Sequence, residues 1–143
     1  VMGGSPDAGA VALCTLAAQS YGLIRLLADL PAWLQRGRSP LPRSLFDAGL
    51  VSTGMRLGSG FAQDLGVLAD ALKPDITATY DAARQRVGIL SRLERLPFLP
   101  LAVVPPYQRR IATASRTPLR APIVLAPILR MTRSAVAHVI GQV

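Results

Sequence analysis

The amino-acid sequence predicts an all-α protein, in which a long N-terminal helix packs on an antiparallel helical hairpin. A proline-rich extended strap and a C-terminal amphipathic helix follow. Three observations favour helix over strand. Ala, Leu and Arg, which are strong helix formers, dominate the chain. Aromatic residues make up only 5% of it and β-branched residues are scattered. No Asn-Gly or Asp-Gly turn joins alternating apolar and polar runs.

The first helix is expected to run from Pro6 to Leu34. Ser5 is the expected N-cap, Pro6 suits the first helical position, and Asp7 in the first turn complements the helix dipole. Residues 8–24 carry no charged side chain, which is close to the shortest length that spans a bilayer. Two interpretations stay open: a buried central helix, which we favour, or a membrane span within residues 8–34.

A second helix is expected from Ser44 to Lys73, after a polar, proline-bearing hinge at 36–44. Apolar and small residues repeat along it at spacings of four and three, namely Val51, Met55, Gly58, Ala62, Leu65, Ala69 and Leu72. Gly54 and Gly58 form a Gly-xxx-Gly pair one turn before Ala62. These three residues therefore predict a close helix contact, either between lipid-embedded helices or inside a soluble bundle.

Pro74 and Asp75 are expected to begin a third helix, because proline at the first turn loses no hydrogen bond. It continues the same apolar period in Ile76, Tyr80, Ala83, Val87 and Leu90. The second and third helices together are the predicted antiparallel hairpin.

Four prolines in residues 96–106 are expected to prevent a regular helix, so this segment is predicted to be an extended apolar strap. Residues 1–95 would then form a helical core and residues 96–143 a tail. The tail becomes helical from Pro127. Val124, Ile128, Met131, Ala135, Val139 and Ile140 can share one face of this last helix, leaving Arg130, Arg133 and Ser134 on the other.

Charge is divided unevenly along the chain. Up to residue 83 there are six basic and seven acidic residues, a net charge of −1, whereas the remainder has ten arginines and one acid, Glu94, a net charge of +9. Arginines beside apolar anchors are typical of contacts with anionic membranes or acidic partners. The residues predicted to make this contact are Arg109, Arg110, Arg116, Arg120, Arg130 and Arg133.

The sequence contains no pattern that indicates catalysis or cofactor binding. Its single cysteine and single histidine exclude an internal disulfide and a Cys/His zinc site. A Ser/His/Asp arrangement would depend on His138, which has no acidic neighbour. We therefore expect a protein that is not an enzyme and has no catalytic residue, metal or cofactor.

Half of the residues are apolar and the mean hydropathy is +0.36, which is more apolar surface than one small domain hides easily. We expect a non-enzymatic accessory or scaffold subunit of a larger membrane-associated assembly, of the energy-transducing, respiratory type. Its partners would be other protein subunits and membrane lipid, in a mitochondrial inner membrane or a bacterial membrane.

Two alternatives stay open. One is a basic RNA-associated protein of the ribosomal type, disfavoured because only Phe98 and Tyr107 in the basic region could stack on bases. The other is an amphipathic coat protein on a lipid surface.

Overall fold

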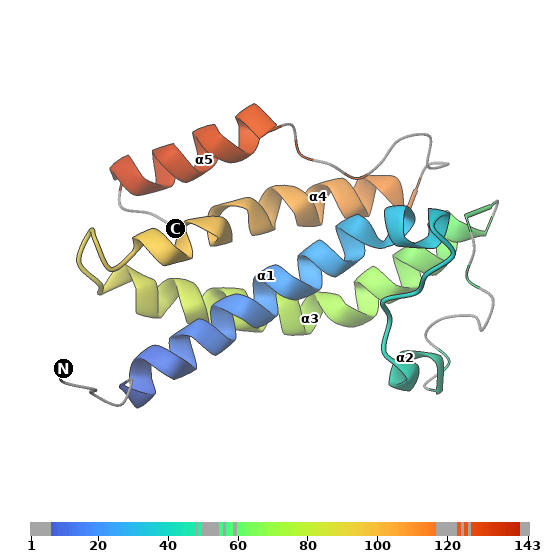
Figure 1. Ribbon diagram of the computed structural model, residues 1–143, viewed down its shortest axis with the longest axis horizontal. Helices are drawn as coiled ribbons and strands as arrows, with labels where there is room; N and C mark the ends of the chain where they lie inside the picture. Colours follow the sequence, from blue (N-terminus) through green and yellow to red (C-terminus); the bar gives the residue numbers. More distant parts are fainter. Residues whose placement is uncertain are drawn as a thin grey trace.

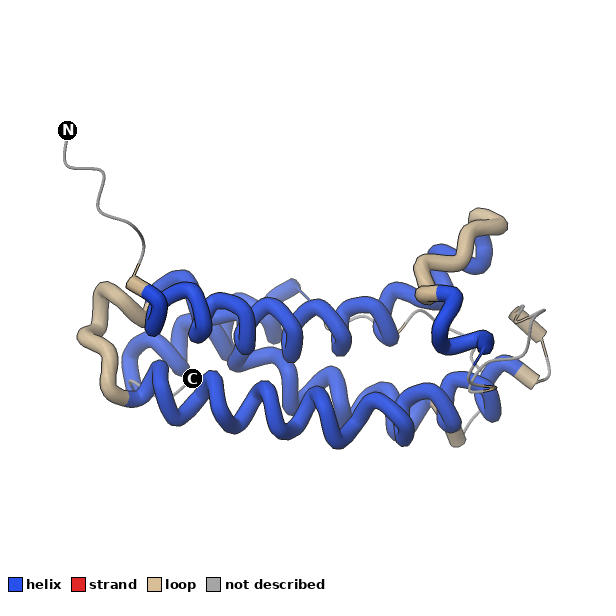
Figure 2. The backbone as a smooth tube through the Cα atoms, turned by 90° about the horizontal axis from the view of Figure 1, so that it is seen from below, coloured by secondary structure: helices blue, strands red, loops and turns tan. Residues whose placement is uncertain are grey.

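The computed structural model describes residues 7–47, 49, 55, 57–58, 60–116, 123, 125 and 127–140. Its elements are α1 (Ala8–Gln35), α2 (Arg43–Asp47), α3 (Phe61–Gly88), the 3₁₀ helix η1 (Leu96–Val103), α4 (Val104–Ala114) and α5 (Pro127–Ile140). Every regular element in these ranges is a helix (Figure 2). The predicted all-α fold is therefore confirmed.

The two long helices, α1 and α3, run antiparallel and share the largest interface in the described part of the protein (Figure 1). From the end of α3 the chain turns back, so that η1 and α4 run in the direction of α1 and pack against both long helices. α5 then returns in the direction of α3 and packs on η1. The central antiparallel pair is thus α1 with α3.

α1 begins at Ala8, two residues later than the sequence predicts, because its N-cap is Asp7. The predicted N-cap, Ser5, lies outside the described residues. The Asp7 carboxylate accepts a hydrogen bond from the backbone N–H of Gly9 at 3.3 Å. At the other end, the Gly37 N–H donates to the Leu34 carbonyl at 3.0 Å. Gly37 has a φ of +67°, a left-handed conformation that glycine adopts without strain, and this ends the helix.

The prediction of separate second and third helices is wrong. Residues 43–47 form the short α2, and α3 then runs without interruption from Phe61 through Pro74 to Gly88. Because Pro74 has no backbone N–H, the carbonyl of Asp70 has no hydrogen-bond donor within the helix. Both residues are exposed, so water can donate to that carbonyl. Burying Leu68 and Ile76 on the opposite side contributes about 1.5–3 kcal/mol each, which outweighs the roughly 3 kcal/mol cost of proline.

The extended strap predicted for residues 96–106 is also wrong, because these residues are helical. Pro97 lies in the first turn of η1, and Pro105 and Pro106 lie in the first turn of α4, where a missing N–H costs no helical hydrogen bond. Within this segment Leu101, Val103 and Val104 are buried, whereas Leu96 is 42% exposed. Three of the four prolines therefore lie in the first turns of two consecutive helices that pack into the core, and Pro100 lies inside η1.

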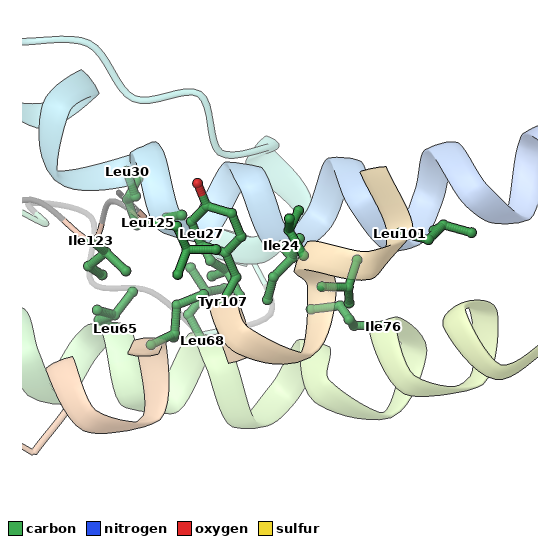
Figure 3. Packing of buried hydrophobic residues seen from close by; sticks show 14 of the residues in the cluster. Ile24, Leu27, Leu30, Leu65, Leu68, Ile76, Leu101, Tyr107, Ile123 and Leu125 are labelled. Atoms are coloured by element: carbon green, nitrogen blue, oxygen red, sulfur yellow. The ribbon is translucent and has the colours of Figure 1, made fainter. Parts of the chain in front are cut away.

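The core is one apolar cluster that runs along the bundle axis between α1, α3 and α4 (Figure 3). Its largest fully buried side chains are those of Tyr107, Phe61, Ile24, Leu27, Leu30, Leu65, Leu68, Ile76, Leu101, Ile111, Leu125 and Val87. Residues on both sides of the boundary expected at residue 95 belong to this cluster. Ile123 and Leu125 close it at the end that holds Leu30 and Leu65.

Candidate functional site

The outer face of α5 is apolar and exposed to solvent. Ile128, Met131 and Val139 are 75%, 71% and 73% exposed, and Ala135 between them is exposed as well. Their spacing places them on one side of the helix. Ala137, on the other side, is buried, and α5 packs on η1. Four of the six residues of the predicted apolar face therefore lie on one exposed side of α5, away from the core, while Val124 and the Ile140 side chain fall outside the described part of the chain.

Arginines flank this face. α5 contains Arg130, which is half-buried, and Arg133, which is exposed, and it contains no acidic residue. α5 is thus a cationic amphipathic helix, as the sequence predicts. Two more apolar side chains, Ile89 and Leu93, are 86% and 77% exposed in the turn between α3 and η1. That turn lies at the same end of the molecule as the C-terminal end of α5 (Figure 1).

A groove of about 610 Å³ separates α5 from α3 and α4. Three arginines line it, each from a different helix: Arg84 from α3, Arg109 from α4 and Arg133 from α5. Among the described residues, none of the three guanidinium groups takes part in a side-chain hydrogen bond or an ion pair. The remaining lining is largely apolar and comes from Ala102, Pro105, Leu129, Val136 and Ala137.

Tyr80 and Thr132 complete the polar lining of the groove. Tyr80 is half-buried, and burial raises the pKa of its phenol above the ordinary value of 10.0. The charge of Arg84 opposes this shift, while that of Asp81 adds to it. At neutral pH the Tyr80 hydroxyl therefore keeps its proton and can donate a hydrogen bond into the groove.

A second pocket, of about 410 Å³, lies between α1, α3 and α4. Arg109 borders both hollows, and Arg116 and Lys73 reach the second one. Asp70 also lines this pocket and provides a negative charge beside the cations. The groove under α5 has no carboxylate among its lining residues, so it is the more strongly cationic of the two.

A polar contact crosses the core between α1 and α4. Arg25 donates to the Tyr107 hydroxyl and to the Asp29 carboxylate, both at 2.6 Å. The Arg25 guanidinium also lies 5.4 Å from the centre of the Tyr107 ring. Tyr107 is fully buried, and its hydroxyl is directed toward α1 (Figure 3). This contact fixes α4 on α1 and so sets where Arg109 emerges.

The predicted arginine contacts fall in different places. Arg109 and Arg133 meet in the groove, Arg116 lines the second pocket, Arg110 is exposed, and Arg120 lies outside the described residues. Sequence reasoning missed Arg84 and Tyr80. Their i, i+4 spacing on α3 was a usable signal, because it places both side chains on one face.

The predicted close contact at Gly54, Gly58 and Ala62 is not found among the residues that can be described. Gly54 lies outside them, and Gly58 precedes α3 and is exposed, with no atom within 4 Å of a Cβ built there. Ala62 is half-buried. On α3 a close approach occurs instead at Gly66, where a Cβ would lie 3.3 Å from the Cβ of Ser115.

α1 is the one described helix that has the length and composition to cross a membrane, with a mean hydropathy of 1.5 over 18 residues. The core helix of a soluble protein and a signal sequence share these properties. Cys14 on α1 is a free, exposed thiol. Within the described ranges, no group of three or more His, Cys, Asp or Glu side chains is placed to hold a metal ion.

No family model, no curated protein and no solved structure matches this chain. Its function has to be inferred from its own residues.

Proposed function

We propose that the chain is a non-enzymatic accessory or scaffold subunit of a membrane-associated assembly, held on an anionic lipid surface by α5. The observation that carries this proposal is the outward apolar face of α5, Ile128, Met131 and Val139, beside Arg130 and Arg133. A helix of this kind lies in the plane of the interface, with its apolar side among the acyl chains.

The apolar side chains dominate the energetics of this contact. Fully burying an Ile, Met or Val side chain contributes about 1.5–3 kcal/mol, whereas an arginine near an anionic surface contributes about 1 kcal/mol. Insertion of Ile128, Met131 and Val139 therefore provides most of the affinity. The arginines select lipid of negative charge, which a mitochondrial inner or a bacterial membrane presents to such a surface.

Two exposed apolar residues in the turn after α3 support the assembly part of the proposal. Ile89 and Leu93 stand out from the folded chain next to Arg92, at the end of the molecule where α5 finishes. Apolar groups this exposed, rimmed by polar ones, are typical of contacts with another protein or with a membrane. We propose that Ile89 and Leu93 contact a neighbouring subunit of the assembly.

Burial of the aromatic residues weighs against the RNA-associated alternative. Tyr107 is fully buried with its hydroxyl bonded to Arg25, and Phe98 is half-buried. Stacking on bases needs an open aromatic face. In the basic part of the chain, the two residues that the sequence offered for stacking are used in packing instead.

Flotation with lipid vesicles tests the proposal. The protein should float with vesicles that contain phosphatidylglycerol and much less with pure phosphatidylcholine. The variant Ile128→Ser/Met131→Ser/Val139→Ser should lose roughly a hundredfold or more in partition, because it removes the inserted apolar surface. Val67→Ser is the control, since Val67 is also exposed but lies on α3. Flotation of the triple variant at the wild-type level contradicts the proposal.

Salt separates the lipid interpretation from the RNA alternative. Binding to a structured RNA should fall steeply between 50 and 500 mM salt, roughly as a power of salt concentration set by the number of phosphates contacted. Vesicle binding through inserted apolar side chains should largely persist. Tight RNA binding with no vesicle binding would favour the alternative.

A further inference from the structure

We propose that the groove beneath α5 is a binding site for the phosphate group of an anionic phospholipid, held by Arg84, Arg109 and Arg133. The Tyr80 hydroxyl donates a further hydrogen bond to the same phosphate. This inference rests on the proposed function and deepens it. The proposed function requires only that the lipid surface be negatively charged, whereas this inference assigns a specific binding site for one lipid molecule.

The positive charge of the groove favours the binding of an anion. Arg84, Arg109 and Arg133 come from three helices to one hollow, and no carboxylate is among its lining residues. Asp81, the acidic neighbour of Tyr80 in sequence, makes no ion pair with any of them among the described residues. Guanidinium groups bind phosphate oxygens in pairs, with a geometry that a lysine ammonium cannot match.

The apolar lining indicates an amphiphile. Leu129 and Val136 of α5 face Ala102 and Pro105 across the groove. A hollow of about 610 Å³ is in the size range of pockets that take small organic ligands, and it exceeds what a bare phosphate would fill. The glycerol backbone and the first methylene groups of a lipid would cover the apolar side chains that free phosphate leaves wet.

The position of the groove fits the depth of a lipid headgroup. An interfacial helix buries its apolar side about 5–10 Å into the boundary between headgroups and acyl chains, and a helix with side chains is about 10–12 Å across. When Met131 and Val139 point into the acyl region, the opposite side of α5 lies among the headgroups. Arg133 and the groove are on that side.

The second pocket is a weaker candidate. It holds Lys73, Arg109 and Arg116, but Asp70 also lines it, and the carboxylate would repel an incoming phosphate. The groove under α5 has no such competitor among its lining residues.

Titration with a short-chain soluble lipid, dihexanoylphosphatidylglycerol below its micelle concentration, tests the site without a membrane. Binding is followed by the chemical shifts of labelled arginine side chains. We expect Arg84→Gln, Arg109→Gln and Arg133→Gln each to weaken binding roughly tenfold, and the matching Arg→Lys variants to restore it only in part. Arg86→Gln is the control: it removes the same charge about 200° around α3 from Arg84.

Glycerol phosphate is titrated in parallel to distinguish the two sources of phosphate. Binding of the lipid that is clearly tighter than that of glycerol phosphate supports the lipid site. Equal affinity for both shows a site for free phosphate esters and overturns it. Equal losses for Arg84→Gln and Arg86→Gln, or no binding of either probe, overturn it as well.

This test is independent of the flotation experiment. Normal vesicle flotation of the wild type, with no effect of the groove arginines on short-chain lipid, leaves the membrane proposal standing and removes only the site. Because Arg84, Arg109 and Arg133 are exposed, their Gln variants should keep the wild-type unfolding midpoint, which is measured for each of them.

Discussion

Tyr107 carries the polar contact that joins α4 to α1. Its hydroxyl accepts a hydrogen bond from a charged partner, Arg25, at 2.6 Å, and its ring fills the core. Tyr107→Phe keeps the ring and removes the hydroxyl. We expect it to lower the free energy of unfolding by about 1–2 kcal/mol, because Arg25 retains Asp29 and partial exposure to water.

Urea denaturation measures this loss. Tyr21→Phe is the matched control, since the Tyr21 hydroxyl has no hydrogen bond with a described residue, and it should change the stability by less than about 0.5 kcal/mol. Equal effects of the two substitutions would show that the Arg25 contact contributes nothing.

Two helical glycines differ in what surrounds them. A Cβ at Gly22 on α1 has no atom within 4 Å, so Gly22→Ala should stabilise the protein by about 0.5–1 kcal/mol through helix propensity alone. A Cβ at Gly66 would press on Ser115 at 3.3 Å, so Gly66→Ala should lose that gain. Thermal unfolding of both variants compares their stabilities directly. An equal gain in stability for Gly66→Ala would mean that Ser115, at the end of α4, moves aside at no cost.

Glu94 contributes a pH-dependent contact at the turn after α3. Its carboxylate accepts hydrogen bonds from the Ser91 hydroxyl at 2.6 Å and the Ser91 N–H at 2.9 Å, and these hold its pKa below the ordinary 4.5. Because folding lowers this pKa, the contact stabilises the fold fully above pH 4.5 and is lost as the pH falls through the lowered value. Ser91→Ala should move the pKa of Glu94, measured by NMR titration, back toward 4.5; an unchanged pKa would contradict this assignment.

Several prolines of this chain lie within helices or in their first turns, where helices were predicted from the sequence to start or to be absent. Pro74 was expected to begin a new helix, and the four prolines of residues 96–106 were expected to prevent a regular one, yet the chain is helical through both places. At Pro74 the apolar period continues in phase from Leu72 to Ile76, and packing overrides the local preference. At Pro97 and Pro105 the first-turn position makes proline compatible with a helix.

Pro74→Ala tests the energetic side of this explanation. α3 already has helical geometry at this position and the proline ring is exposed, so the alanine variant should restore a backbone hydrogen bond and add about 1–2 kcal/mol to the free energy of unfolding. Urea denaturation followed by circular dichroism measures the change. A loss of stability would show that proline is needed to fit α3 against α1.

The apolar face of α5 illustrates what periodicity can and cannot predict. The spacing of Ile128, Met131, Ala135 and Val139 correctly places these residues on one side of a helix. It does not tell whether that side faces a core, because this depends on the partner. Here the smaller Ala137 packs inward and the larger side chains point outward.

The groove is a property of the whole chain path. Arg84, Arg109 and Arg133 are far apart in sequence, and they meet only because α4 doubles back along α3 and α5 doubles back again over η1. The sequence supplied the excess of arginine after residue 83 and the absence of nearby acid. It carried no signal for the order in which the helices stack, so Arg116 and Arg110 were included in the predicted contacts beside Arg109. Arg84 was left out, although its i, i+4 spacing from Tyr80 places the two on one face of α3.

The whole molecule combines a buried apolar core with apolar side chains that are exposed to solvent. Leu101, Val103, Val104 and Tyr107 of the proline-rich segment are buried, which removes part of the uncovered surface expected from composition, and Leu96 stays 42% exposed. What stays uncovered is concentrated on α5 and in the turn at Ile89 and Leu93. The membrane interpretation therefore depends on α5 much more than on overall hydropathy.

A fluorescent probe on the outer face of α5 reports whether that face enters lipid. Met131→Cys is labelled with an environment-sensitive dye in a Cys14→Ser background, with Gln63→Cys on the exposed side of α3 as the control. With phosphatidylglycerol vesicles, we expect the emission at residue 131 to shift to the blue and to be quenched by a lipid-borne quencher, and that at residue 63 to stay unchanged. An unchanged, water-like emission at residue 131 would contradict the assignment of α5 to the membrane.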